Sequence, residues 1–466
     1  MLFSSLPFLY YFLPAVLLLY FAAPRRLKNT VLLAGSLVFY AWGEPRFVLV
    51  MLAEILLGYL FGRCIEKHRG TARGRLLLIL ALTLDLGALG YFKYADFFLR
   101  SVNAVTGLSL PLLQITLPIG ISFYTFQIIS YLVDVWRGTV PAQKNLVDLA
   151  AYVAMFPQLI AGPIVRYSEI AQQLRERRHT LEDAALGARR FVLGLSKKVL
   201  IANVLYQLMT AFQSSTQRSV LFCWVYALCC VLQIYFDFSG YSDMAIGLGR
   251  IFGFRFAENF DHPCVSRSVT EFWRRWHISL GSWFRDYVYI PLGGSRVSRG
   301  RQLRNILVVW LLTGLWHGAA WNFVLWGLLF ALLLMAEKRF LLPVLQKRRL
   351  LSRLYMLLIL PLSFVLFNAG SISEAFSQIA AMFGGGGLPL WNAETLYELR
   401  SYGVVLLMAI LGATPIPARL MERWRRSSLG NRLQTLTEAP ALAALLLVNT
   451  AYLVDGSFNP FLYFRF

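Results

Sequence analysis

The sequence predicts an all-α protein that crosses a membrane many times. Of its 466 residues, 58% are hydrophobic and only 15% are charged, and the mean hydropathy is +0.58. A soluble domain carries about 25% charged residues, so a soluble globule of this composition could not cover its own surface. The hydrophobic runs are continuous over about 20 residues, the length of one helical span, and they do not alternate as barrel strands do.

The expected spans can be placed in order from the breaks between the runs. They are 3–23, 30–42, 46–62, 76–98, 117–136, 191–212, 219–236, 303–320, 321–342, 354–369, 402–418 and 439–454. Residues 146–160 lie between two basic stretches and are predicted to be re-entrant, and residues 240–290 are predicted to be irregular or interfacial. We expect about eleven to twelve transmembrane helices in a single integral-membrane domain over 1–466.

Charge supports this topology. The chain has 45 Lys and Arg against 24 Asp and Glu, a net charge of +21, and the basic residues cluster between hydrophobic runs. Such loops mark the cytosolic side, so the expected partner surface is the lipid bilayer and no nucleic-acid partner is expected. The first run is followed, not preceded, by Arg25, Arg26 and Lys28, which predicts a retained span with its N-terminus outside.

No metal site, disulfide framework or bound cofactor is expected. The five cysteines are odd in number and show no paired spacing. No cluster of His, Cys and carboxylate residues has metal-ligand spacing, and the sequence has no glycine-rich phosphate loop.

Polar side chains inside hydrophobic runs are costly and mark candidate functional sites. His317 is the clearest case, because on a helix it would share one face with Trp310, Thr313, Gly314 and Trp321. Aromatic walls, with glycines that clear space beside an imidazole, are typical of a pocket, and imidazole takes up a proton near neutral pH. A structural histidine that only donates a hydrogen bond is the alternative.

A second histidine, His277, lies in an aromatic and basic stretch. Tryptophans recur there at helical spacing, which predicts one amphipathic helix at the membrane interface. Arginines bind phosphates well, so this stretch supplies candidate substrate-binding residues: Trp273, Arg274, Arg275, Trp276, Arg285 and Asp286. The same arginines could instead anchor the helix at the interface.

Two carboxylates, Asp237 and Asp243, flank the pair Ser239 and Gly240, which predicts a helix break. We expect these carboxylates either to pair with the arginines of 271–286 or to orient a histidine.

Several stretches of this sequence resemble the membrane-bound O-acyltransferase family. The family resemblance lies in Tyr235–Gly249, Asn259–Asp286 and Leu315–Gly318. The branch that contains the bacterial alginate O-acetylation membrane protein is similar at Leu117–Asp134, Phe156–Pro163, Tyr289–Arg296 and Asn459–Phe466. The likeness runs through essentially the whole chain, with several long strings in order.

The resemblance implies acyl transfer to a hydroxyl, with His317 as the catalytic histidine and His277 as the family's second histidine. It implies a funnel and a tunnel in a bacterial inner membrane, with acetyl-CoA or another acyl thioester arriving from the cytosol. The acceptor would be an exported polysaccharide such as alginate, reached directly or through an extracytoplasmic acetyltransferase partner. Where relatives often carry Tyr-His-Gly, this chain has Leu329, Phe330 and Ala331, a difference that bears on the substrate more than on the reaction.

On this hypothesis His317 is a general base toward the acceptor hydroxyl, a role worth about 10²–10⁴-fold in rate. Trp316 and Asn322 are candidate donors to the developing oxyanion. Two alternatives stay open: transfer of D-alanyl or another acyl group from a carrier protein, and a polysaccharide transporter or export scaffold. A transporter would be expected to show pseudo-symmetric halves, and no internal repeat is visible.

Overall fold

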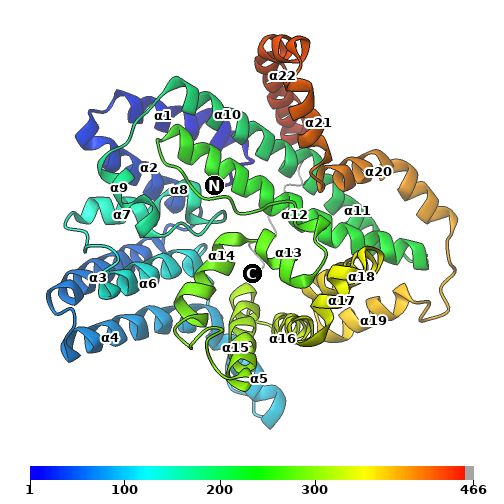
Figure 1. The fold of residues 1–466 in the computed structure, drawn as a ribbon, viewed down its shortest axis with the longest axis horizontal. Helices are drawn as coiled ribbons and strands as arrows, with labels where there is room; N and C mark the ends of the chain where they lie inside the picture. Colours follow the sequence, from blue (N-terminus) through cyan, green and yellow to red (C-terminus); the bar gives the residue numbers. More distant parts are fainter. Residues whose placement is uncertain (457–466) are drawn as a thin grey trace. The chain divides into compact units, whose positions relative to one another are not determined.

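The computed structural model describes residues 1–456, and this range consists of helices and loops (Figure 1). Within that range no strand is present, which confirms the predicted all-α class. The C-terminal string Asn459–Phe466 lies outside the described residues.

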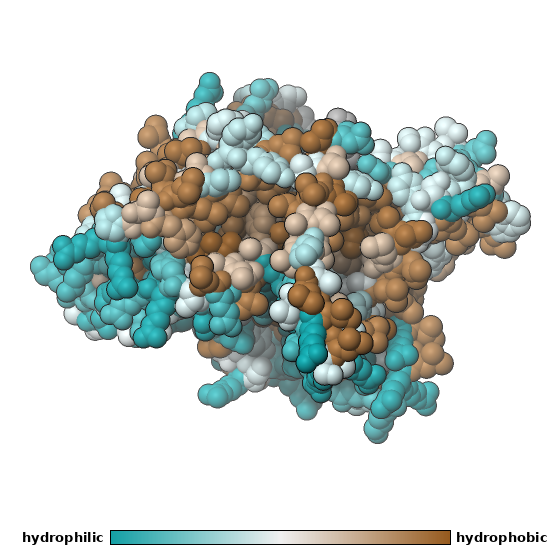
Figure 2. All heavy atoms as spheres, turned by 90° about the horizontal axis from the view of Figure 1, so that it is seen from above, coloured by the Kyte–Doolittle hydropathy of each residue, from teal (hydrophilic) through white to brown (hydrophobic). Residues whose placement is uncertain are grey.

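Within residues 1–456, seven helical segments are long and hydrophobic enough to cross a membrane. They are Val48–Lys67, Ala72–Thr106, Leu181–Ser214, Val220–Ile251, Arg349–Asn368, Ala393–Gly412 and Ser428–Asp455. Figure 2 shows hydrophobic side chains over much of the visible surface, as lipid contact requires. These segments confirm a polytopic membrane protein.

The remaining expected spans fall on shorter or more charged helices. Helix α6 (Ile121–Arg137) has 17 residues, α16 (Trp321–Ala336) has 16, and α15 (Arg299–His317) begins with several arginines. Whether these segments also cross the membrane stays a prediction, and so does the expected total of eleven to twelve crossings.

The chain divides into two compact units, residues 1–191 with 244–257, and residues 192–243 with 258–466. The expectation of a single domain over 1–466 stays a prediction. In chain order, the helices of the first unit include α1 (Leu13–Ala22), α2 (Lys28–Gly43), α3 (Val48–Lys67), α4 (Ala72–Leu89), α5 (Ala95–Thr106), α6, α7 (Leu146–Ala154), α8 (Phe156–Leu159), α9 (Tyr167–Arg175) and most of α10 (Leu181–Ser196).

Close helix packing in the first unit depends on small residues. Helix α3 packs on α6 through Gly58 and Gly62, one turn apart. A Cβ atom at Gly62 would lie 2.7 Å from the hydroxyl of Tyr131, so a side chain there would force the Tyr131 ring out of its place. Small residues at such interfaces are typical of membrane bundles.

The segment predicted to be re-entrant is short and buried. Helix α7 has nine residues and α8 has four, and both are buried along most of their length. At about 1.5 Å per residue neither helix could cross a bilayer. The chain turns at Met155, between the two helices, and Pro157 lies in the first turn of α8, where its missing N–H has no helical partner to lose.

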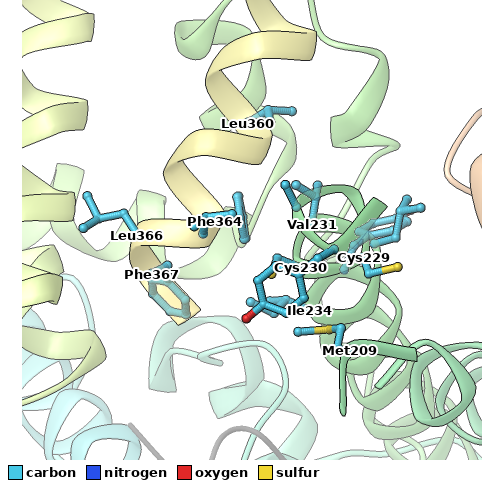
Figure 3. Packing of buried hydrophobic residues seen from close by; sticks show 14 of the residues in the cluster. Met209, Cys229, Cys230, Val231, Ile234, Leu360, Phe364, Leu366 and Phe367 are labelled. Atoms are coloured by element: carbon cyan, nitrogen blue, oxygen red, sulfur yellow. The ribbon is translucent and has the colours of Figure 1, made fainter. Parts of the chain in front are cut away.

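The second unit holds the later helices. They are α11 (Asn203–Ser214), α12 (Val220–Ile251, up to Asp243), α13 (Val269–Arg275), α14 (Ile278–Phe284), α15, α16, α17 (Leu342–Lys347), α18 (Arg349–Asn368), α19 (Ile372–Met382), α20 (Ala393–Gly412), α21 (Ile416–Arg425) and α22 (Ser428–Asp455). Their hydrophobic core includes residues of α11, α12 and α18 such as Met209, Cys230, Ile234 and Phe364, shown in Figure 3.

The predicted helix break at Ser239 and Gly240 is wrong, because α12 runs without interruption through both residues. Gly240 serves close packing: a Cβ atom there would lie 2.7 Å from the carbonyl oxygen of Gly194 and 3.2 Å from the amide of Lys198. Glycine is tolerated inside this helix because a neighbouring backbone takes the space of its side chain.

Glycines also set the contact between α15 and α16, which pack closely against each other. A Cβ atom at Gly314 would collide with the carbonyl oxygen of Phe323, and one at Gly327 would collide with that of Trp310. The expectation that Gly314 clears space beside His317 is therefore wrong, because helix α16 fills that space.

Candidate active site

The stretch around His277 is not the single helix that its tryptophan spacing predicts. Helix α13 ends at Arg275, Trp276 is extended, and α14 begins at Ile278. His277 between them has φ of +45°, a left-handed conformation that costs about 1–3 kcal/mol for a residue other than glycine. Backbone strain of this kind persists only where surrounding contacts hold it in place, and it is common at functional sites.

Asn259 holds this strained turn. Its carbonyl oxygen accepts a hydrogen bond from the Ile278 amide at 3.0 Å, and its side-chain Oδ1 accepts from the Ser279 amide at 3.3 Å. Oδ1 also lies 3.1 Å from Nδ1 of His277, while Nδ2 donates to Ser242 at 3.0 Å. A backbone N–H can only donate, so the amide atom facing Ser279 is the oxygen.

This network fixes the tautomer of His277. Because Oδ1 of Asn259 can only accept, Nδ1 of the imidazole carries the proton and Nε2 presents its lone pair. His277 is 1% exposed, and within residues 1–456 its Nε2 atom has no hydrogen-bond partner. A neutral imidazole with a free Nε2 lone pair can accept a proton from a substrate.

Glu337 anchors the start of α13. Its buried carboxylate accepts hydrogen bonds from the amides of Val269 and Thr270, at 2.6 and 2.8 Å, and from the Thr270 hydroxyl at 2.6 Å. A carboxylate at a helix N-terminus satisfies amides that have no partner within the helix. Ser268 adds an N-cap by accepting from the amide of Glu271.

Helices α13 and α14, which these contacts hold in place, line a cavity of about 540 Å³, here called the site cavity, within the usual size range of small-molecule sites. Its wall includes His277, Trp276 and Ser282 near the turn, and Trp310 and Thr313 on α15. Its charged lining residues are Arg274 and Arg285. Arg285 is bound by both carboxylate oxygens of Asp286, at 2.6 and 3.0 Å, whereas Arg274 forms no ion pair within the described residues.

His317 lies on the same face of α15 as the wall residues Trp310 and Thr313, as its spacing predicts, and it is 7% exposed. Three aromatic rings surround its imidazole, with centroids 5.0, 5.1 and 5.2 Å away: those of Trp316, Trp326 and Phe367. Trp321 does not share this face. Helix α15 ends at His317, and Trp321 begins α16 with half of its side chain exposed.

Trp316 lies between the two imidazoles. Its ring centroid is 5.7 Å from that of His277 and 5.0 Å from that of His317. The two histidines are also close enough for a charge on His317 to act on His277. The structure therefore brings together His277, Trp316 and His317, which the sequence alone could not place relative to one another.

Phe330, where the family resemblance leads us to expect a histidine, is completely buried. Its ring centroid is 4.9 Å from those of Trp273 and Trp326 and 5.4 Å from that of Trp310. Ala331 beside it is buried as well. This position is a packed aromatic wall and offers no group that could transfer a proton.

Other candidate residues lie elsewhere or have other contacts. Arg275 faces away from the site cavity and pairs with Glu271 and Asp261, each at 3.1 Å. Asn322 donates to the backbone carbonyls of Phe367 and Ala369, so its amide joins α16 to the end of α18. We therefore no longer propose that Asn322 donates a hydrogen bond to the oxyanion or that Arg275 binds the acyl donor.

Both aspartates of α12 pair with lysines. Asp237 lies 2.6 Å from Nζ of Lys198, and Asp243 lies 2.6 Å from Nζ of Lys197, in the π-helical turn Lys197–Ala202. The expected pairing with the arginines of 271–286 is wrong, because the lysines between α10 and α11 pack against α12. Because a lysine neutralises each of the two carboxylates, we assign both a structural role.

Three residues that support the site were missed from the sequence. Asn259, Ser279 and Glu337 belong to the second unit, and each acts through contacts with residues distant in the chain. Glu337 carried a usable signal, because a carboxylate at the end of a hydrophobic run requires a partner. Asn259 carried none, because an asparagine in a short polar stretch that ends at Pro263 suggests only a turn.

Burial holds the pKa of His277 well below its ordinary value, and His317 acts in the same direction. His277 lies outside the seven candidate spans. The unfolded chain binds this proton near pH 6.5 and the folded chain does not, so stability falls as the pH drops below about 6.5. We expect the apparent Tm in detergent to fall more between pH 7.5 and 5.5 in the wild type than in His277→Gln; equal slopes would contradict this.

Comparison with known proteins identifies the family of the chain. The family model of the membrane-bound O-acyltransferases matches residues 141–373. The chain is 40% identical to the probable alginate O-acetylase AlgI of Azotobacter vinelandii and 39% identical to that of Pseudomonas aeruginosa, over the full length of both chains in each case. It is 34% identical to the peptidoglycan O-acetyltransferase of Helicobacter pylori, over 84% of this chain and 81% of that protein.

The family model covers the turn at His277, the end of α15 at His317 and all the residues that line the site cavity. These matches confirm the family predicted from the sequence strings. This multi-pass membrane protein therefore belongs to the membrane-bound O-acyltransferase family and is an O-acyltransferase similar to alginate O-acetylases.

Proposed function

We propose that this protein transfers an acetyl group from a cytosolic acyl thioester, such as acetyl-CoA, to an exported polysaccharide such as alginate. The acceptor is either a sugar hydroxyl or a hydroxyl of an extracytoplasmic acetyltransferase partner that passes the group on. We place the protein in the cytoplasmic membrane of a bacterium, with its N-terminus outside. The full-length similarity to probable alginate O-acetylases supports this substrate class.

The observation that carries the proposal is a pair of buried imidazoles, one of which, His277, lines a cavity with aromatic walls, whereas His317 is not among the lining residues. His277 presents a neutral Nε2 to the cavity wall, and His317 lies beyond Trp316. A site of this kind excludes water, which protects a reactive thioester from hydrolysis. A transporter or a scaffold would not need two buried imidazoles, one of them in the wall of a cavity.

The chemistry needs one base and one path for the acyl group. We assign His317 as the general base that removes the proton from the acceptor hydroxyl. The alkoxide oxygen attacks the thioester carbonyl, the carbon–sulfur bond breaks, and the leaving thiolate takes a proton. His277, with its free Nε2, is placed to hold or relay a proton on the donor side. Arg274, without an ion pair within the described residues, would attract the donor phosphates.

The test is acetyl-ester content in cells that lack the chromosomal gene, compared with the same cells carrying a plasmid copy. We would measure acetyl esters per sugar in the exported polysaccharide, the amount of polymer exported, and alanine esters on the envelope. Membrane vesicles supplied with radiolabelled acetyl-CoA would test the donor directly. We expect acetyl esters to disappear without the gene while polymer export continues.

Other outcomes select other functions. Loss of polymer export itself would identify a transporter or an export scaffold. Loss of alanine esters would identify D-alanyl transfer from a carrier protein. Loss of acetyl esters from peptidoglycan, with the exported polymer unchanged, would replace the acceptor with the one named for the Helicobacter pylori relative.

A further prediction concerns Asn259 as a positioning residue. Removal of its side chain in Asn259→Ala frees the His277 ring to rotate, and misplacement of this kind costs up to about a hundredfold in rate. Asn259→Asp keeps an acceptor for Nδ1 and should retain more activity. The added negative charge favours protonated His277. As the pH is lowered, the variant should therefore lose activity at a higher pH than the wild type does. Acetyl transfer in vesicles as a function of pH measures both the rate and its pH dependence. An unchanged pH profile in Asn259→Asp would contradict the expected shift.

A further inference from the structure

A second cavity in the same unit is separate from the site cavity and has no role in the proposed reaction. It measures about 630 Å³ and shares no lining residue with the site cavity. Helix α13 lies between the two: Trp273 and Arg274 line the site cavity, whereas Glu271 and Arg275 line the second. We call the second one the arginine cavity.

One part of the arginine cavity is hydrophobic and comes from two candidate membrane spans. Helix α12 supplies Val231 and Leu232, and α18 supplies Met356, Leu357 and Leu360. Figure 3 shows Val231 and Leu360 on these two helices. Walls of this kind fit a hydrocarbon chain, and their position on spanning helices brings them to the depth of the bilayer.

The rest of the lining is strongly cationic. Four arginines, namely Arg267, Arg275, Arg353 and Arg419, face a single carboxylate, that of Glu271. Arg275 is already bound by Glu271 and Asp261. The side chains of the other three form no ion pair or hydrogen bond within residues 1–456, so they keep their full capacity to bind an anion.

Hydrocarbon walls beside uncompensated arginines match an amphiphile with an anionic head. A soluble phosphate compound would leave the hydrophobic walls without a partner, and a neutral lipid would leave the arginines without one. Basic pockets between membrane helices bind the head groups of anionic phospholipids. We propose that the arginine cavity binds an anionic phospholipid, with its phosphate on Arg353 and Arg419 and one acyl chain along α12 and α18.

The volume is consistent with this assignment. A cavity of about 630 Å³ lies within the range of small-molecule sites and holds a head group with the first part of one chain. The rest of the lipid would extend along the exposed side of Leu357, which is 67% exposed.

The experiment uses the full chain, purified in detergent and stripped of lipid. Phosphatidylglycerol, phosphatidylcholine and inorganic phosphate are added separately, and bound lipid is counted by native mass spectrometry alongside the apparent Tm. We expect one phosphatidylglycerol to be retained, with a rise in Tm that phosphatidylcholine and phosphate do not give. No turnover is measured, so the result is independent of the proposed acetyl transfer.

Three variants make the test specific. Arg353→Gln with Arg419→Gln should weaken lipid retention about tenfold or more, because both phosphate-binding charges are lost. Leu357→Trp fills the cavity from an exposed position and should block the chain while it keeps the charges. The control, Arg423→Gln with Arg432→Gln, removes two exposed charges outside the cavity and should behave as the wild type.

Three results would overturn the proposal. Unchanged retention in the double variant would remove the arginines from the site, and equal loss in the control would show general charge attraction. An equal Tm rise with inorganic phosphate would show that the cavity binds a free anion and that its hydrophobic walls play no part.

Discussion

Replacement of His317 by Ala is expected to reduce acetyl transfer by about 10²–10⁴-fold, the usual contribution of a general base. The imidazole is the titratable group at the end of α15, and its neighbours Trp316, Trp326 and Phe367 offer aromatic faces that cannot accept the proton. The measurement is acetyl-ester content per sugar at matched membrane levels, together with label transfer in vesicles.

Because Ala also leaves a space between three rings, a second variant separates chemistry from packing. His317→Gln keeps a polar side chain of similar size but has no titratable nitrogen, and it should be as inactive as His317→Ala. His68→Gln, at a helix end in the first unit, is the control and should retain full activity. Acetyl transfer by His317→Gln within tenfold of the wild type would refute the general-base assignment.

The sequence was a good guide wherever hydropathy and helical period decide the outcome. The polytopic all-helical class follows from continuous hydrophobic runs. The buried face of Trp310, Thr313 and His317 follows from helical period, because α15 is regular up to its last residue. Burial of the 146–160 segment followed from its two basic flanks, which no single crossing could satisfy.

Prediction failed where a distant contact overrides a local pattern. The tryptophan spacing continues through His277 as if the helix were unbroken, and only Asn259, 18 residues earlier, holds the left-handed turn. For the same reason, charge alone could not show whether Asp237 pairs with arginines or with lysines. A signal was present, however, because Lys197 and Lys198 fall inside an expected span and must pair there.

Loss of the buried pair between Asp237 and Lys198 is expected to destabilise the protein by about 3–5 kcal/mol. Their side chains are 5% and 2% exposed, and their charged atoms lie 2.6 Å apart. In Asp237→Asn the buried ammonium group of Lys198 loses the negative charge that lies 2.6 Å away, and this lost attraction causes most of the destabilisation. The measurement is apparent Tm in detergent, with membrane abundance in cells.

Two further variants test whether the loss of stability comes from a buried charge. Asp237→Leu combined with Lys198→Met removes both charges and should recover most of the stability, since well-packed hydrophobic residues often replace buried pairs. The pair between Asp243 and Lys197 is more exposed, at 17% and 33%, so Asp243→Asn should cost about 1 kcal/mol or less. If the double variant recovers stability and acetyl transfer together, Asp237 has no part in the reaction, because its carboxylate is absent from an active enzyme. If stability returns without activity, Asp237 acts on the chemistry, and the structural role assigned to it here is wrong.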